Sequence, residues 1–126
     1  GLGAGLMAFL DARLEKGFDM IAAVVALEEK IRQADLVITG EGKLDKQTRF
    51  GKTPYGVAQM ARKFGRPVIA VAGALDEDAG LLYDHGFDLL MPIQEKPVDL
   101  ESSLKEGARL LERTGERMAR LLKMEI

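Results

Sequence analysis

The sequence has no cysteine and no tryptophan, and His85 is its single histidine among 126 residues. The lack of cysteine excludes disulfides, a thiolate nucleophile and a sulfur-ligated zinc site. One histidine excludes a metal site built from several histidines of this chain. No apolar run approaches the roughly 20 residues that a membrane-spanning helix needs. These absences predict a protein without a membrane segment, and a cysteine-free chain suits the reducing cytoplasm.

Basic charge is not in excess either, because 18 lysines and arginines face 20 acidic residues, a formal net charge of -2. Such a chain has no positive field to attract nucleic acid or anionic lipid, so we expect neither as a partner. By contrast, 47% of the residues are hydrophobic and 14 are glycine. This length and composition predict one domain over residues 1–126 with no internal boundary. Because the chain opens on Gly1 and not on methionine, we expect it to be a piece of a longer protein.

Hydrophobic periodicity predicts the order of helices and strands. Helices are expected over residues 2–14, 19–33, 54–64 and 99–123, with a weaker one over 78–84. Strands are expected over 36–38, 68–72 and 88–91, the first of them buried on both faces because it is wholly apolar. The last helix is expected to bury one stripe, in which two glycines allow close packing on a neighbour: Leu100, Leu104, Gly107 with Ala108, Leu111, Gly115, Met118 and Leu122.

Strands that alternate with helices predict an α/β fold, a parallel sheet with helices on both faces and right-handed crossovers. Three strands make a small sheet, and no strand precedes the first two helices. We therefore expect the second half of a larger α/β domain. Ligands of such sheets bind beyond the carboxyl ends of the strands, which here lead into residues 40–53, 73–78 and 92–98.

The longest of these connections, Gly40 to Thr53, has the composition of an anion-binding loop. Glycines let backbone N–H groups approach a phosphate, and the helix that starts at Pro54 presents its positive end. Lysines supply counter-charge, and Glu41 and Asp45 are able to hold a cation or accept a proton. A P-loop is excluded because Lys46 stands where that motif needs glycine. From composition alone, a solvated connection with ordinary turn glycines is an equal alternative.

Three other features are weaker. The glycines of residues 1–5 are not a dinucleotide fingerprint, because Leu6 replaces its third glycine and no strand precedes them. Asp76 follows the second strand, where it is able to contact a metal or hydroxyl, but a helix N-terminus equally favours it, and we prefer that structural role. His85 is expected to end a helix.

The segment Asp35 to Ala58, DLVITGEGKLDKQTRFGKTPYGVA, resembles the signature of the bacterial (type 1) glycerate kinases, which phosphorylate glycerate with ATP and lack a P-loop. The opening Gly1 to Leu10, and the regions 67–73 and 97–111, extend the resemblance over essentially the whole chain. It covers only the C-terminal third of that family's members.

This resemblance implies a three-layer, Rossmann- or flavodoxin-like parallel-sheet domain that is incomplete without N-terminal strands. It implies ATP, Mg²⁺ and glycerate as ligands of a cytoplasmic enzyme whose product is a phosphoglycerate, with the 2-phosphate favoured. The missing N-terminal part is the expected partner, and the isolated chain is expected to be inactive. The alternative is a non-catalytic α/β fragment that binds a phosphorylated ligand or a complementary chain, or self-associates through an open sheet edge.

The resemblance places the site in the same connection. Lys52 is expected to neutralise phosphate and Asp45 to act as a base or Mg²⁺ ligand, with Glu41 as a second acid near the metal. Lys43 stands where we expect arginine in many relatives, which weakens a planar carboxylate contact. The residues expected to bind substrate or phosphate are Thr39, Gly40, Gly42, Lys43, Gln47, Thr48, Gly51 and Thr53.

Overall fold

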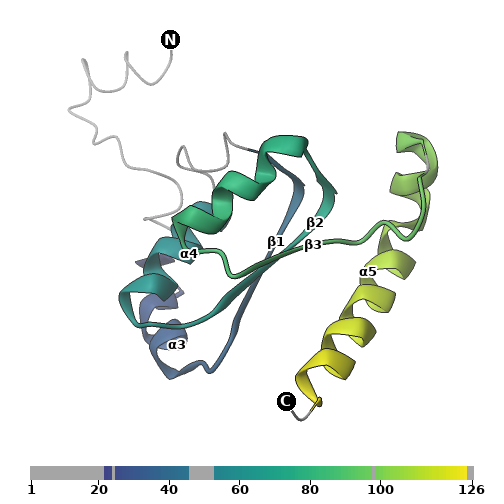
Figure 1. Ribbon diagram of the computed structural model, residues 1–126. Coiled ribbons are helices and arrows are strands. Elements are labelled where there is room, and N and C mark those ends of the chain that lie inside the picture. The colour runs from purple at the N-terminus through teal and green to yellow at the C-terminus, as the bar shows by residue number, and fades with distance from the viewer. Residues whose placement is uncertain (1–21, 24, 46–52, 98, 125–126) are drawn as a thin grey trace, which may run out of the picture.

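The computed structural model describes residues 22–23, 25–45, 53–97 and 99–124. The helix expected over residues 2–14 lies outside this part of the chain. Three strands form one parallel sheet in the order β1-β2-β3, namely β1 Val37–Leu44, β2 Val68–Leu75 and β3 Leu89–Pro92. The α/β fold with a parallel sheet is therefore confirmed (Figure 1).

Strand β1 is longer than the sequence pattern predicts. Its pairing with β2 continues from Val37 opposite Val68 to Leu44 opposite Leu75. The expectation that a loop begins at Gly40 is therefore wrong, because residues 40–44 find backbone partners in the extended β2. Glycines and charged side chains are tolerated there because this part of β1 is mostly exposed.

The other correction to β1 concerns its burial. The strand lies at an edge of the sheet, and the Ile38 side chain is 52% exposed. A strand buried on both faces was the wrong prediction for this apolar run. Only β2, between two neighbours, has five consecutive buried residues, Val68 to Ala72.

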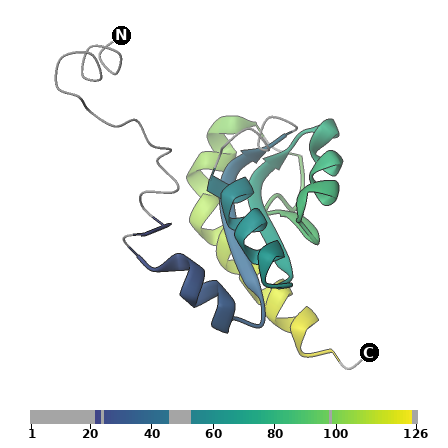
Figure 2. The same cartoon turned by 90° about the vertical axis from the view of Figure 1, so that its left-hand side faces the viewer.

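One face of the sheet, called here the α4 face, carries α3 Leu27–Gln33, α4 Thr53–Lys63 and the 3₁₀ helix η2 Glu77–His85 (Figure 2). Their apolar side chains and those of the strands form one core cluster, whose fully buried members include Leu44, Ala58, Val68 and Leu82. Helix α4 agrees with its prediction within one residue at each end, and Gly65, with φ 67°, follows it.

Of two further predictions on this face, one is wrong and one is confirmed. The helix expected over 19–33 is interrupted, since Ala26 has φ 54° and α3 begins only at Leu27. His85 does end a helix, as expected: it is the last residue of η2, before Gly86 with φ 95°. The His85 carbonyl accepts a hydrogen bond from Gln59 Nε2 at 2.6 Å, which ties η2 to α4.

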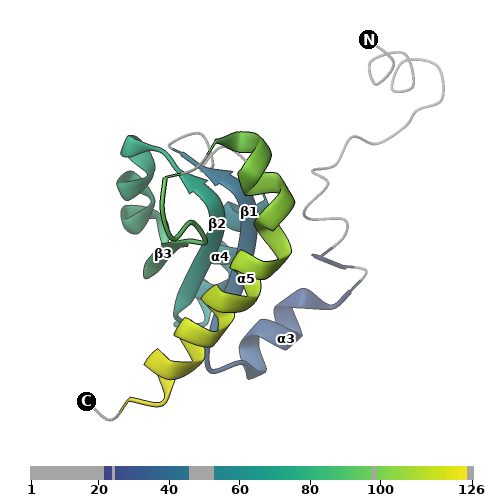
Figure 3. The same ribbon diagram turned by 90° about the vertical axis from the view of Figure 1, so that its right-hand side faces the viewer.

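Helix α5, Leu100–Leu122, lies across the opposite face, called here the α5 face (Figure 3). It begins where expected, because the Asp99 side chain accepts a hydrogen bond from the backbone N–H of Ser102 at 2.7 Å. Met118 packs against Ile69 and Val71 of β2. Helices on both faces confirm the three-layer arrangement.

The buried side of α5 differs from the predicted stripe. The buried residues are Leu110, Thr114 and Met118, whereas Leu104 is 74% and Leu111 is 53% exposed. The predicted stripe therefore overlaps the core only at Met118. Among the described residues, a Cβ added at Gly107 or Gly115 would meet no atom within 4 Å, so close packing on this part of the chain is not the reason for these glycines.

The charged residues of α5 behave as a solvated helix face. Lys105 pairs with Glu101 at 3.1 Å and Arg120 with Glu116 at 3.1 Å, both at i,i+4 spacing on exposed side chains. In the part of the chain that the structure describes, no helix is both long enough and apolar enough to cross a membrane.

Candidate active site

The described part of the candidate site lies at the carboxyl ends of β1 and β2. Thr39, Gly40, Glu41, Gly42 and Lys43 are all residues of β1, and Asp45 follows the strand directly. Strand geometry therefore fixes the spacing of these residues, since successive side chains point to opposite faces of the sheet. Thr39 and Asp45 are partly buried, whereas the residues from Gly40 to Lys43 are exposed to solvent.

Two glycines make the end of the sheet unusually tight. A Cβ added at Gly73 would lie 2.7 Å from the Gly42 carbonyl oxygen. A real side chain there would push the strands apart, because Cβ atoms do not approach carbonyl oxygens that closely. Just beyond, the Asp76 backbone N–H donates to the Leu44 carbonyl at 3.0 Å. The glycines thus place the ends of β1 and β2 in direct contact.

An ion pair joins the end of β1 to the residue that follows β2. Lys43 Nζ lies 3.3 Å from Asp76 Oδ2, and both side chains are about half exposed. Asp76 also takes the N-cap position of η2, although its side chain makes no capping hydrogen bond there. The pair orients the Lys43 ammonium at the sheet edge and leaves it accessible to an anion from solvent.

Asp76 was the residue that sequence reasoning assigned to a structural role. Its place at the start of η2 agrees with that role, and its carboxylate in addition contacts Lys43, one of the predicted binding residues. The available signal was its position: an acid that directly follows β2 comes close to the end of the neighbouring parallel strand.

Among the acids, Glu41 Oε1 accepts the backbone N–H of Gly42 at 3.0 Å. Its carboxylate is exposed, and so is that of the nearby Asp76. Within the described ranges, no group of three or more histidine, cysteine, aspartate or glutamate side chains is arranged to hold a metal ion. The described acids therefore offer at most one or two carboxylates to a cation.

Helix α4 begins at Thr53, an exposed residue, and Pro54 occupies its first turn in a buried position. Proline suits the first helical turn because its missing N–H has no helical partner there. The remaining predicted site residues lie outside the described residues; these are Gln47, Thr48, Gly51 and Lys52. The structure thus places Thr39 through Lys43 along β1, Asp45 directly after it and Thr53 at the start of α4.

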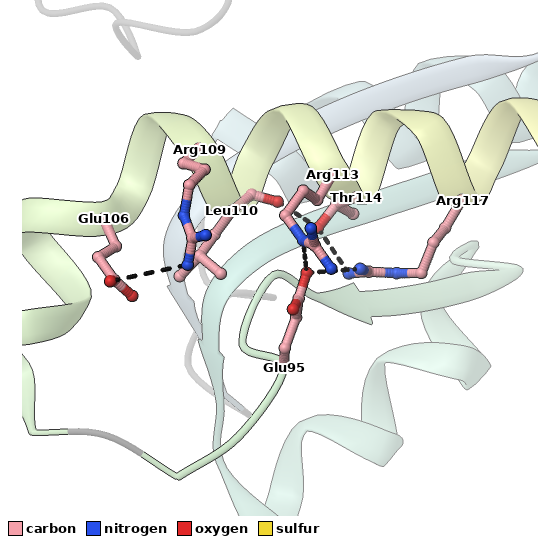
Figure 4. Close-up of polar contacts among 7 residues, drawn as sticks. All are labelled: Glu95, Glu106, Arg109, Leu110, Arg113, Thr114 and Arg117. Carbon is pink, nitrogen blue, oxygen red and sulfur yellow. Dashed lines mark hydrogen bonds and ion pairs between the residues drawn. The ribbon is translucent and has the colours of Figure 1, made fainter.

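A second polar cluster holds α5 next to the segment that follows β3. Glu95 accepts from Arg113 Nε and, at 3.1 Å, from Arg117 Nη1, while Arg117 Nη2 lies 3.0 Å from Thr114 Oγ1 (Figure 4). The hydrogen bond from Arg113 is the main reason why the pKa of Glu95 lies below its usual value. A small cavity of about 150 Å³ opens beside the cluster. Because Glu95 already engages both arginines, we assign the cluster to the attachment of α5.

Comparisons with known proteins cover almost the whole chain. The model of the glycerate kinase family matches residues 1–123. The glycerate kinase of Bacillus subtilis is 42% identical over 124 residues, which are 98% of this chain and 32% of that protein. The glycerate 2-kinase of Escherichia coli K12 is 46% identical over 93 residues, 74% of this chain and 24% of that protein.

A solved structure agrees with these matches. The crystal structure of a protein from Salmonella typhimurium LT2, described as glycerate kinase 2, superposes with a TM-score of 0.72 at 38% identity. The match covers 98% of this chain and 31% of that one. The chain spans about a third of the length of the curated relatives it matches. On the family model, the relatives and the superposition, the chain belongs to the glycerate kinase family.

Proposed function

We propose that the full-length protein containing these 126 residues is an ATP-dependent kinase that transfers a phosphoryl group to glycerate. The observation that carries this proposal is the segment from Asp35 to Ala58, which lies within the family match and contains β1 and the start of α4. Ligands of parallel α/β sheets bind at this end of the strands. Family membership favours the kinase over the non-catalytic fragment that composition alone leaves open.

The 2-hydroxyl of glycerate is our proposed acceptor, since a relative matched at 46% identity is named glycerate 2-kinase. The chain is proposed to be the C-terminal third of a cytoplasmic enzyme. Its Rossmann- or flavodoxin-like sheet would then be completed by strands from the remaining polypeptide, which would also supply the other wall of the active site.

Within this chain, the exposed Lys43 ammonium is suited to a phosphate or the glycerate carboxylate. Its contact with Asp76 at 3.3 Å keeps it at the sheet edge until an anion replaces that partner. Lys52 is proposed to neutralise the transferred phosphoryl group, and Asp45 to accept the proton of the attacking hydroxyl. The start of α4 at Thr53 adds backbone N–H groups and the positive end of the helix.

Mg²⁺ is the proposed metal, because it usually binds through one or two carboxylates together with substrate phosphates and water. The acids at the end of β1 fit that demand: Glu41 is exposed there and Asp45 follows the strand. When bound, the ion would neutralise charge on the phosphates of ATP. Glu41 would hold it at the carboxyl end of the sheet, and Asp45 would do so only in place of serving as the base.

The test measures ATP-dependent phosphorylation of glycerate by the full-length protein and by its Asp45→Asn and Lys52→Ala variants. We expect both variants to lose about 100-fold or more of kcat/KM, as is usual when a base or charge-stabilising group is removed. Lys63→Ala is the matched control, because Lys63 pairs with Glu28 at 2.7 Å at the far end of α4. Wild-type kcat/KM in both site variants would overturn the assignment, and no phosphorylation by the wild-type protein would overturn the function.

The 126-residue chain by itself is expected to show no turnover in the same assay. It contributes one side of the site, from the ends of its strands to the start of α4, so one wall of the proposed cleft is missing. Measurable turnover by the purified chain would contradict this.

A further inference from the structure

The α5 face of the sheet is only partly covered. In the described residues, α5 is the only helix that packs on this face, whereas α3, α4 and η2 lie on the other (Figures 1 and 3). Parallel sheets are normally buried on both faces, since their backbone and apolar side chains need cover from water. One helix spans about 10 Å, which leaves part of a three-stranded face open.

The register shows which strand is left open. Ile38 of β1 pairs with Ile69 of β2, and Ile69 packs against Met118 of α5. Residues paired across parallel strands point to the same face, so Ile38 points to the α5 face. Yet Ile38 is 52% exposed, which places the uncovered strip along β1.

Helix geometry shows that the exposed leucines of α5 lie on the side of the helix that faces the same edge of the sheet. Arg113 contacts Glu95, which follows β3, so this side of α5 faces the β3 edge. Leu104 is nine residues from Arg113, or about two and a half turns, and therefore lies on the opposite side of the helix. Leu111 lies about 160° from Arg113 by the same count. Because β1 and β3 are the two edges of the sheet, the exposed leucines face the β1 edge.

We infer that this apolar strip, made of Ile38, Leu104 and Leu111, is the docking surface for a helix from the part of the glycerate kinase polypeptide outside these 126 residues. The relatives supply the occupant, because about two thirds of their length lies beyond the matched region. Gly40, the next residue of β1 on this face after Ile38, has no side chain to hold such a helix away. The helix would pack beside α5 and cover β1 as α5 covers β2.

The absence of cysteine from the chain makes the surface directly measurable. Leu104→Cys and Leu111→Cys are prepared in both the full-length protein and the 126-residue chain, and thiol alkylation rates are followed by peptide-resolved mass spectrometry. Glu112→Cys is the matched control, because Glu112 is an exposed neighbour of Leu111 on the outward side of the same helix. Circular dichroism confirms that each variant keeps its helical content.

In the 126-residue chain, all three positions are expected to be alkylated at similar rates. In the full-length protein, Leu104→Cys and Leu111→Cys are expected to be alkylated at no more than about one tenth of their rates in the 126-residue chain. Glu112→Cys is expected to stay within about twofold of its rate in the chain. Equal rates for the leucine positions in both proteins would overturn the proposal. Protection already present in the 126-residue chain would also overturn it: protection that grows with concentration would assign the strip to a second copy, and protection independent of concentration to residues 1–21.

The docking surface rests on family membership and not on the reaction. Phosphorylation of glycerate by the full-length protein is therefore measured in parallel. Glycerate phosphorylation without protection of the cysteines from alkylation would overturn only the docking surface. Protection without phosphorylation would overturn only the proposed function.

Discussion

The two faces of the sheet differ in how deeply they are packed. On the α4 face, thirteen buried residues from three helices, the strands and the segment before β3 form one cluster. On the α5 face, the cluster has three buried members, Ile69, Val71 and Met118. Helix α5 depends in addition on polar contacts, chiefly those of Glu95 with Arg113 and Arg117. The difference indicates that the α4 face stabilises this chain by itself, while the α5 face is arranged to receive more polypeptide.

The largest expected difference between the faces is the loss of unfolding free energy when one leucine on each face is replaced by alanine. Leu82 on the α4 face is 0% exposed, and Leu82→Ala is expected to cost about 2–5 kcal/mol of unfolding free energy through lost burial and a cavity. Leu104→Ala in the 126-residue chain is expected to change it by no more than about 0.5 kcal/mol. Urea unfolding of the chain measures both. Similar losses for the two variants would show that the faces do not differ.

The contact between β1 and β2 supports both faces, and Gly73→Ala tests it. The added Cβ would meet the Gly42 carbonyl oxygen at 2.7 Å, so we expect a loss of about 1–3 kcal/mol from the strain of separating the strands. Gly80→Ala is the control, since a Cβ at Gly80 meets nothing within 4 Å. Urea unfolding gives the free energies. If the two variants are equally stable, the close approach of the strands is not a constraint.

A smaller effect of opposite sign is expected on α5. Gly107→Ala and Gly115→Ala fill open space inside a helix, so each is expected to stabilise the 126-residue chain by about 1 kcal/mol. The full-length protein sharpens the comparison of faces: an alanine that stabilises the chain but destabilises the full-length protein marks a glycine where the docked polypeptide comes close. Thermal unfolding of both proteins shows whether each alanine raises or lowers the stability. Destabilisation of the 126-residue chain would contradict the claim that an added Cβ finds open space at these glycines.

The sequence predicts the parts of this fold that local chemistry determines. The bounds of α4, within one residue, and the end of a helix at His85 follow from short patterns, and both are confirmed. The length of β1 does not follow from its own composition, because residues 40–44 pair with β2 only after the two strands meet. The ion pair of Lys43 with Asp76 was not predicted for the same reason.

The buried side of α5 was mispredicted for a related reason. Periodicity identifies an apolar stripe, but it does not say whether the surface that covers it belongs to these residues. Leu104 and Leu111 belong to the stripe and stay exposed, while Thr114 is buried, which its hydroxyl tolerates because it donates to the Leu110 carbonyl at 2.8 Å. The hydrophobic pattern therefore describes the longer polypeptide better than it describes this chain.

The smallest expected effect concerns the start of α5 and depends on pH. The backbone N–H of Ser102 holds the pKa of Asp99 below its ordinary value of 3.8. The ionised carboxylate therefore stabilises the folded chain above that value, and this contribution is lost as the pH falls through the lower pKa of the folded state.

Asp99→Asn keeps a capping oxygen that does not titrate. The Tm of the wild-type chain should exceed that of Asp99→Asn at neutral pH, and this difference should shrink below pH 3.8. Asp99→Ala has no capping oxygen and should lower the Tm at neutral pH by more than Asp99→Asn does. Protonation of Glu95 affects all three proteins alike and cancels in these differences. A difference between wild type and Asp99→Asn that stays constant with pH would show that the cap does not depend on charge, and α5 would then rely on its contacts with β2 and Glu95 alone.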